Sequence, residues 1–257
     1  MILADTHTHL YLDEFDNDLE EVIKRAENSG IKFFFLPAVD SSTHTKMIEA
    51  ERRHPGKLFS MMGLHPCSVK ENYTEELAVV KDYLQKRTFA AVGEIGLDFY
   101  WDKTFTDRQY EAFEIQMQWA LDYKLPIVIH TRNAMKETIA AVKPFAVKGL
   151  RGIFHCFGDS YDAALQITEM GFYLGIGGVV TYKKAGLENV LDKISIDCIV
   201  LETDAPYLPP VPYRGKRNES SYLKIIAERV AEIKNIKPEE VAEITLANAQ
   251  KIFGQNL

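Results

Sequence analysis

Two histidines separated by one residue, His7 and His9, follow a short apolar run near the start of the chain. In an extended strand the side chains alternate between faces, so residues two apart point the same way. The two imidazoles would then lie close enough to bind one metal ion, at about 2.0–2.1 Å from each nitrogen. The alternative is a turn with two surface histidines. The pair therefore matters only if other parts of the chain supply further ligands.

Further imidazoles and carboxylates follow other short apolar runs. They lie in the segments Gly63-Leu64-His65-Pro66, Gly93-Glu94-Ile95-Gly96-Leu97-Asp98, His130-Thr131-Arg132, His155-Cys156-Phe157 and Glu202-Thr203-Asp204. Five of the seven histidines thus follow an apolar run, and the other two, His44 and His54, fall in a segment of helical period. Imidazole with carboxylate suits Zn²⁺, Mn²⁺ or a similar divalent ion, and more carboxylate favours Mg²⁺.

Eight short apolar runs rich in β-forming residues alternate with segments of helical period. The runs are 2–4, 32–36, 58–62, 89–92, 127–129, 152–154, 172–176 and 198–201. The helical segments are about 12–29, 43–53, 75–87, 107–123, 133–143, 160–170, 183–192, 219–234 and 238–252. This alternation, in a chain of this size, predicts an α/β fold with a closed (β/α)8 TIM barrel. The alternative is an open doubly wound sheet, which usually has a Gly-rich phosphate loop where this chain has Asp5-Thr6-His7-Thr8-His9.

Local signals agree with this organisation. Gly30 is placed to end the first helix, while Thr106-Asp107 and Gly158-Asp159-Ser160 are typical of helix starts. We find no internal repeat, low-complexity tract or linker, so we expect a single TIM-barrel hydrolase domain over 1–257. The Pro-rich stretch 206–212 follows the eighth predicted strand and is expected to form a long active-site loop.

Composition restricts the class of protein. The net charge of −7 argues against a surface coated in positive charge for bulk nucleic-acid binding, although a local anion site is compatible with it. Three cysteines without CxxC spacing, and no secretory signal, indicate reduced thiols in a cytoplasmic protein. There is no run of about 18 apolar residues, so we expect no membrane span.

A barrel would bring all these strand ends to one rim, where barrel active sites lie. These histidines and carboxylates outnumber the three protein ligands that one catalytic zinc needs. Two ions about 3.5–4 Å apart, sharing one carboxylate, would use all of these side chains as ligands. We assign His7, His9 and Asp204 to one ion, His130 and His155 to the other, and Glu94 as the bridge. Taken singly, His130 or His155 could instead be a buried, hydrogen-bonded histidine. Cys156 is expected to face away from His155 and pack in the barrel wall.

These motifs, together with Leu201-Glu202-Thr203-Asp204-Ala205-Pro206-Tyr207, resemble the TatD family of metal-dependent hydrolases. The similarity runs from residue 5 to about 222, and Arg214-Gly215-Lys216-Arg217-Asn218-Glu219 resembles the family's loop after the last strand. The departures are Ala205, where Ser is common, and Ser220, where Pro is common. Neither is a ligand position. The resemblance implies a barrel of the amidohydrolase superfamily, a divalent-metal-dependent deoxyribonuclease activity, and the metal roles assigned above.

For such a reaction we expect metal-activated water to attack a DNA phosphodiester. Asp204 would orient or deprotonate the water, and Glu94 would hold both divalent ions, which are Zn, Mg or Mn. His65 and Arg132 would bind the phosphate, because a guanidinium forms two parallel bonds to phosphate oxygens. The remaining candidate contacts to DNA are Arg214, Lys216 and Arg217, which could equally form a solvated loop.

Two aromatic residues after Asp98, Tyr100 and Trp101, could stack an unpaired base or pack beneath their loop, and the sequence favours packing.

A rival function is hydrolysis of small esters, lactones or amides by the same metal pair. Many such sites are bridged by a carboxylated lysine of the fourth strand, where this chain has Glu94 and no lysine before Lys103. An inactive binding scaffold is a third possibility, but it has no chemical reason to keep every ligand. We expect a monomer, although the sequence does not determine the oligomeric state.

Overall fold

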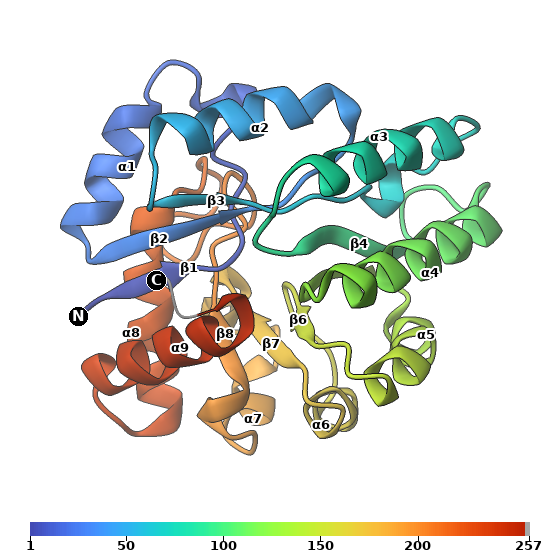
Figure 1. Ribbon diagram of the computed structural model, residues 1–257. Coiled ribbons are helices and arrows are strands. Elements are labelled where there is room, and N and C mark those ends of the chain that lie inside the picture. The colour runs from blue at the N-terminus through green and yellow to red at the C-terminus, as the bar shows by residue number, and fades with distance from the viewer. Residues whose placement is uncertain (255–257) are drawn as a thin grey trace.

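The computed structural model describes residues 1–254, in which eight parallel strands alternate with helices (Figure 1). The strands are β1 (Leu3–Asp5), β2 (Ile31–Leu36), β3 (Leu58–Ser60), β4 (Val92–Asp98), β5 (Ile127–Arg132), β6 (Gly152–Phe154), β7 (Tyr173–Ile176) and β8 (Ile199–Leu201). The α-helices are α1 (Leu19–Asn28), α2 (Ser41–Arg53), α3 (Tyr73–Lys86), α4 (Thr106–Tyr123), α5 (Met135–Val147), α6 (Tyr161–Glu169), α7 (Leu187–Leu191), α8 (Leu223–Lys234) and α9 (Pro238–Phe253). Positions 255–257 of the predicted domain lie outside the described residues.

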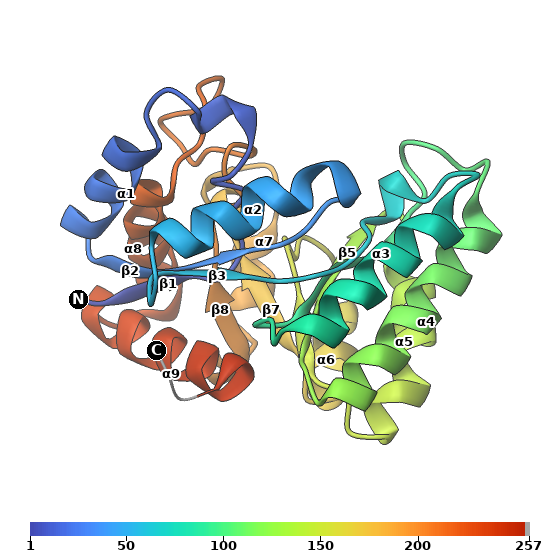
Figure 2. The same cartoon turned by 45° about the horizontal axis from the view of Figure 1, so that its top comes forward.

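The barrel consists of two hydrogen-bonded sets of strands that meet at two seams. β1, β2 and β3 form one parallel set, and β4 to β8 form a second. A parallel bridge between Met62 and Val92 joins the two sets. At the other seam, the backbone N–H of Thr6 donates to the carbonyl oxygen of Leu201 at 3.1 Å, which joins β1 to β8. The helices lie around the outside of this barrel (Figure 2), so the predicted (β/α)8 fold is confirmed.

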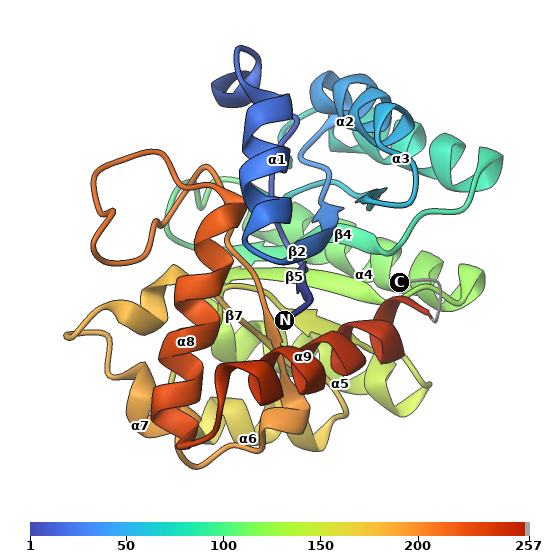
Figure 3. The same cartoon turned by 90° about the vertical axis from the view of Figure 1, so that its left-hand side faces the viewer.

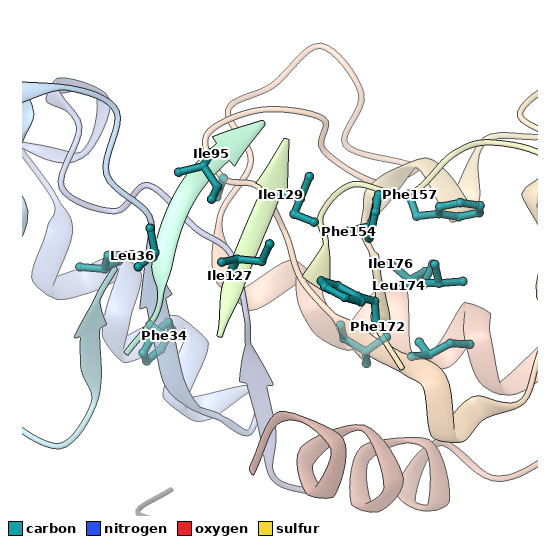
Figure 4. Close-up of a cluster of buried hydrophobic side chains, with 14 of the residues drawn as sticks. Phe34, Leu36, Ile95, Ile127, Ile129, Phe154, Phe157, Phe172, Leu174 and Ile176 are labelled. Atoms are coloured by element: carbon teal, nitrogen blue, oxygen red, sulfur yellow. The ribbon is translucent and has the colours of Figure 1, made fainter. Parts of the chain in front are cut away.

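Alternate strand positions separate into two apolar layers, as the period of two requires. One layer faces the helices and includes Phe34 and Leu36 of β2 and Ile129 of β5 (Figure 4). The other fills the barrel interior, with members Ala4, Phe35, Met61, Ala91, Val128, Ile153 and Val200. Ala249 of α9 belongs to this interior cluster, and Phe253 stacks on Phe35 with ring centroids 3.8 Å apart. Helix α9 therefore covers one end of the barrel (Figure 3).

The fourth strand is placed differently from the prediction. The apolar run 89–92 was expected to be the strand, but β4 begins at Val92 and continues to Asp98. It pairs in parallel with β5 up to Asp98 opposite Arg132. The glycines and acidic residues of this segment resemble a loop in sequence, whereas strand pairing keeps the segment extended. As a result, Glu94 lies within a strand and not after its end.

All three predicted helix signals are confirmed. Gly30 has a left-handed φ of +97° directly after the C-cap of α1, and Ser160 caps α6 by accepting the N–H of Ala163 at 3.2 Å. The helix start at Thr106-Asp107 is confirmed as well, because α4 begins at Thr106, although Phe105 stands at its N-cap without a side-chain bond. Within residues 1–254, no helix combines the length and apolar character needed to cross a bilayer.

Candidate active site

The interior face of the barrel leads directly to the histidines. Val128 belongs to the interior cluster, and His130 lies two residues further along β5. Ile153 has the same relation to His155, which directly follows the end of β6. Because side chains two apart share a face, both imidazoles continue the interior layer at the carboxyl ends of the strands. The mouth of the barrel is therefore lined by polar groups.

Glu94 lies at the centre of these groups and is almost fully buried. Its Oε2 is 3.1 Å from Nε2 of His7 and 3.8 Å from Nε2 of His9. Its Oε1 is 2.9 Å from Nδ1 of His130 and 3.6 Å from Nε2 of His155. The two oxygens of one carboxylate thus face two different sets of imidazoles, as a bridging ligand would.

Asp204 approaches the same centre from the seam between β8 and β1. Its Oδ1 lies 3.6 Å from Nε2 of His9 and 3.8 Å from Nε2 of His7. The backbone follows a left-handed turn at Asp204, with φ of +56°, and its N–H donates to the carbonyl of His7. Asp5, fully buried, accepts bonds from the N–H and hydroxyl of Thr203 at 2.9 and 2.6 Å. These bonds hold the residue before Asp204 against β1.

A tyrosine hydroxyl orients His9. Tyr11 donates its O–H to the carbonyl oxygen of Pro37 at 2.5 Å. With that proton committed, the hydroxyl oxygen accepts from Nδ1–H of His9, 3.1 Å away. The neutral imidazole then has an unprotonated Nε2, which faces Glu94 and Asp204. His9 therefore presents a lone pair to the centre of the site.

Carboxylates lie behind two further histidines, on the side away from Glu94. Asp98 places Oδ2 2.8 Å from Nε2 of His130, opposite the nitrogen that faces Glu94. Glu202 is fully buried and places Oε1 2.8 Å from Nδ1 of His155, outside hydrogen-bond geometry, while the same oxygen accepts the backbone N–H of Cys156 at 2.6 Å. Gly175 of β7 leaves the space for this carboxylate, because a Cβ there would collide with its Oε2. Metal-ligating histidines typically have such outer partners.

His65 differs from the other histidines in the nitrogen that it turns inward. Its Nδ1 accepts the backbone N–H of Cys67 at 3.1 Å, so the hydrogen of the neutral ring is on Nε2. That Nε2 lies 3.5 Å from Oε1 of Glu94. Although its donor atoms are close enough to form a metal group with Glu94 and His130, His65 presents an N–H. It is suited to donate to an oxygen of Glu94 or of a substrate.

The protonation states of Glu94 and of the histidines around it depend on one another. Burial raises the pKa of Glu94, but electrostatic interaction with the imidazoles of His7, His155 and His65 outweighs burial and holds that pKa well below its usual value. Burial and neighbouring histidines lower the pKa of His7, His9 and His155, which favours neutral imidazoles.

Two groups of the centre hold a proton more strongly than usual. Burial lowers the pKa of His130, but bonds to Asp98 and Glu94 outweigh it and raise that pKa to about 9. Burial, followed by the charge of Glu94, raises the pKa of Asp204 to about 8. At neutral pH both groups therefore bind a proton that a metal ion would displace.

The donor set fits divalent metal ions. Ligand atoms lie within 4.8 Å of one another in the groups His7–His155–Asp204, His7–His9–Glu94, His65–Glu94–His130 and His155–Cys156–Glu202. Neutral imidazoles and an ionised carboxylate, with outer partners that fix the rings, are what such ions require.

The expectation that Cys156 faces away from His155 is wrong, because its sulfur lies within 4.8 Å of a ring nitrogen of His155. The strand β6 ends at Phe154, and Cys156 adopts a left-handed φ of +48°, so the alternation of a strand does not apply to it.

Arg132 lies at the rim of the barrel mouth and not in its centre. Its guanidinium is 3.9 Å from the ring centroid of Tyr100 and 5.2 Å from that of Trp101. Both aromatic side chains are exposed, so the expectation that they pack beneath the loop is wrong. Arg132 and Cys156 both line an open cavity of about 570 Å³ between the starts of α5 and α6.

The other basic residues predicted to contact DNA, Arg214, Lys216 and Arg217, lie on the β8–α8 loop (residues 205–219). This loop projects from the barrel (Figure 3). Arg217 binds the carboxylate of Asp18 through two nitrogens, at 2.8 and 2.7 Å, and packs over Phe15. It is therefore committed to holding the loop against α1. Arg214, which stacks on Tyr182, and Lys216 are exposed. These two cations remain accessible to a substrate.

The sequence indicated no role for three residues that lie behind the histidines, Asp98, Glu202 and Tyr11. Asp98 and Glu202 were noted at predicted strand ends, and their spacing from His130 or His155 gives no sign of the contact. Tyr11 continues the alternate spacing of His7 and His9, which is a weak signal at best. The contacts of Asp98 and Glu202 join residues far apart in the sequence, whereas Tyr11 contacts His9 two residues away and is held in place by Pro37.

Residues 4–254 match the family model described as TatD related DNase. The chain belongs to this family. The Bacillus subtilis protein YabD, named an uncharacterized metal-dependent hydrolase, is 39% identical over 99% of this chain and 100% of its own length. The 3'-5' ssDNA/RNA exonuclease TatD of Erwinia tasmaniensis is 29% identical over 98% of this chain and 99% of its own. The crystal structure of YjjV, a TatD homologue from Escherichia coli, superposes with a TM-score of 0.92 at 26% identity and covers 98% of this chain and 97% of its own. The TatD-family chain is thus a metal-dependent hydrolase.

Proposed function

We propose that this hydrolase is a deoxyribonuclease that cleaves phosphodiester bonds with two divalent metal ions. The observation that carries the proposal is Glu94, whose two oxygens face separate sets of imidazoles. A bridged pair of cations at a buried carboxylate suits an anionic substrate such as a phosphodiester. The name of the Erwinia relative, an exonuclease of single-stranded DNA and RNA, supports the same substrate class.

The ligands that would hold the ions are His7, His9, Glu94, His130, His155 and Asp204. When bound, the ions would supply Lewis-acid stabilisation of charge at phosphorus and a water of lowered pKa. The protein orients His9 through Tyr11 and His130 through Asp98, and the carboxylate of Glu202 lies against His155. Because these partners are in place without rearrangement, little reorganisation would be needed at the moment of reaction.

Three side chains would act on the substrate directly. His65 would donate its Nε2–H to a phosphate oxygen, since its other nitrogen is occupied by Cys67. Arg132 would bind the phosphate group at the rim, where its guanidinium is exposed. Asp204 would accept a proton from the attacking water, because its carboxylate lies beside His7 and His9 and its side chain keeps 13% exposure.

The test is cleavage of end-labelled DNA. Single-stranded and duplex oligonucleotides, labelled at either end, are incubated with Mg²⁺, Mn²⁺ or Zn²⁺ and with a chelator. The proposal expects metal-dependent cleavage that the chelator abolishes. A Glu94→Gln protein, purified in parallel, controls for contaminating nucleases.

The same preparations are tested on a panel of small esters, lactones and amides. Hydrolysis of these compounds, with no DNA cleavage under any metal, would overturn the proposal in favour of a small-molecule hydrolase. Cleavage that persists unchanged in the Glu94→Gln protein would show that the nuclease is a contaminant.

A further inference from the structure

Two large aromatic side chains stand exposed immediately after β4. Tyr100 is 51% exposed and Trp101 is 67% exposed, with their ring centroids 4.9 Å apart and nearly perpendicular. The preceding residue, Phe99, packs against the hydrophobic core. The same short segment thus partly buries one ring and leaves two in solvent. Adjacent exposed aromatic residues at the rim of a site mark a binding surface.

The turn that presents these rings is held by buried and partly buried hydrogen bonds. Oδ1 of Asp98 accepts the backbone N–H groups of Tyr100 and Trp101 at 2.9 and 3.0 Å. Gln109 of α4, 2% exposed, donates to the carbonyl of Asp98 at 3.2 Å and to that of Asp102 at 3.4 Å. Because the turn is ordered in advance, a ligand that stacks on the rings would spend little free energy on ordering them.

One residue connects this turn to the candidate metal centre. While Oδ1 of Asp98 holds the turn, its Oδ2 lies 2.8 Å from Nε2 of His130. The guanidinium of Arg132, from the adjacent strand β5, lies 3.9 Å from the Tyr100 ring. Within residues 1–254, no carboxylate forms an ion pair with Arg132. Exposed π-faces and an available positive charge therefore lie together beside the centre.

We infer that Tyr100 and Trp101 form a stacking platform for an unpaired nucleobase next to the phosphate that is cleaved, and that this platform gives a preference for single strands. The inference rests on the proposed nuclease function. Every base has a π-face, so stacking on aromatic rings binds single strands with little regard to sequence. In a duplex those faces are covered by neighbouring bases, and the platform gains nothing without unpairing. Arg132 adds attraction to the phosphate of the same nucleotide.

The experiment measures affinity for a short phosphorothioate single strand, which resists cleavage, and for an abasic strand of the same length and charge. Trp101→Ala should weaken binding of the normal strand about tenfold, the scale of one lost base stack. Binding of the abasic strand should change by less than about twofold, because it has no base to stack. Trp101→Phe, which keeps a ring, should recover most of the loss.

Tyr123→Ala is the matched control, because Tyr123 is an exposed aromatic residue at the C-terminal end of α4, outside the site. In a Trp119→Phe background Trp101 is the remaining tryptophan, and its fluorescence should be quenched by the normal strand and not by the abasic strand.

Equal affinity of the wild-type protein for normal and abasic strands would overturn the platform, as would equal losses for both strands in Trp101→Ala. DNA cleavage accompanied by either result would leave the nuclease function standing. Absence of both DNA binding and DNA cleavage in the wild-type protein would overturn the two proposals together.

Discussion

The candidate metal centre and the β8–α8 loop both carry charged side chains, but they hold them in different ways. In the centre, Glu94 and His130 lie within the paired strands β4 and β5, and Glu94 is 3% exposed with imidazoles on both sides. In the loop, Lys216 and Arg214 extend into solvent, while Arg217 is bound to Asp18. A strand position determines where a side chain points, whereas a loop position acquires its role from whichever partner it meets.

The largest expected effect is at the shared carboxylate. Glu94→Gln removes the charge that faces both sets of imidazoles, so affinity for both ions should fall by more than about 100-fold, the upper end of the effect of losing an outer partner. Nuclease activity should fall with it at any practical metal concentration. Activity titrations against each metal measure this. Wild-type turnover in the variant would mean that Glu94 does not bridge.

A smaller effect is expected at the outer partner of His130. Asp98→Asn should reduce metal affinity about 10–100-fold. In metal-free protein, Asp98 and Glu94 raise the pKa of His130 to about 9 against the effect of burial, so the variant should show a lower pKa by NMR titration. An unchanged titration would exclude the Asp98 contact.

The sign of the linked stability effect follows from that pKa. A raised pKa in the folded state stabilises the protein below the unfolded value of about 6.5, and the stabilisation is lost as the pH rises through about 9. Metal-free wild-type protein should therefore lose more unfolding free energy over this range than Asp98→Asn. Parallel curves from denaturant titrations would contradict the assignment.

His65 provides a sharper distinction within the centre. Because its Nδ1 is bound to Cys67 and its Nε2 carries hydrogen, His65→Ala should retain the wild-type metal content. It should nevertheless lower kcat/KM for DNA by about tenfold or more, the effect of one lost bond to a charged group. His65→Gln, which keeps an N–H donor, should recover part of the loss. A reduced metal content in His65→Ala would make His65 a ligand.

The smallest effects are expected in the loop, and they should differ in kind. Arg217→Ala should lower the free energy of unfolding by about 1 kcal/mol, since its pair with Asp18 is partly exposed. Lys216→Ala should leave stability within about 0.5 kcal/mol and reduce the salt dependence of DNA binding by about one charge. Thermal unfolding and binding at several salt concentrations distinguish the two. A reversed pattern would show that Arg217 contacts DNA.

The sequence predicted the barrel and brought the candidate residues to one rim because period two and strand-helix alternation are local properties. It placed the fourth strand too early, because the acidic, glycine-containing segment from Gly93 to Asp98 is extended only through pairing with β5. It treated Arg217 like its neighbours, because the contact with Asp18 joins residues 199 positions apart. The outer role of Glu202 likewise depends on the space that Gly175 leaves on another strand.

The most direct test of the central claim is the metal content of the protein. After chelation, reloading with one divalent metal at a time and removal of free ions, elemental analysis should give two ions per wild-type chain. Two ions are expected because each oxygen of Glu94 faces its own set of nitrogens. One ion or none at saturation would contradict a site bridged by Glu94.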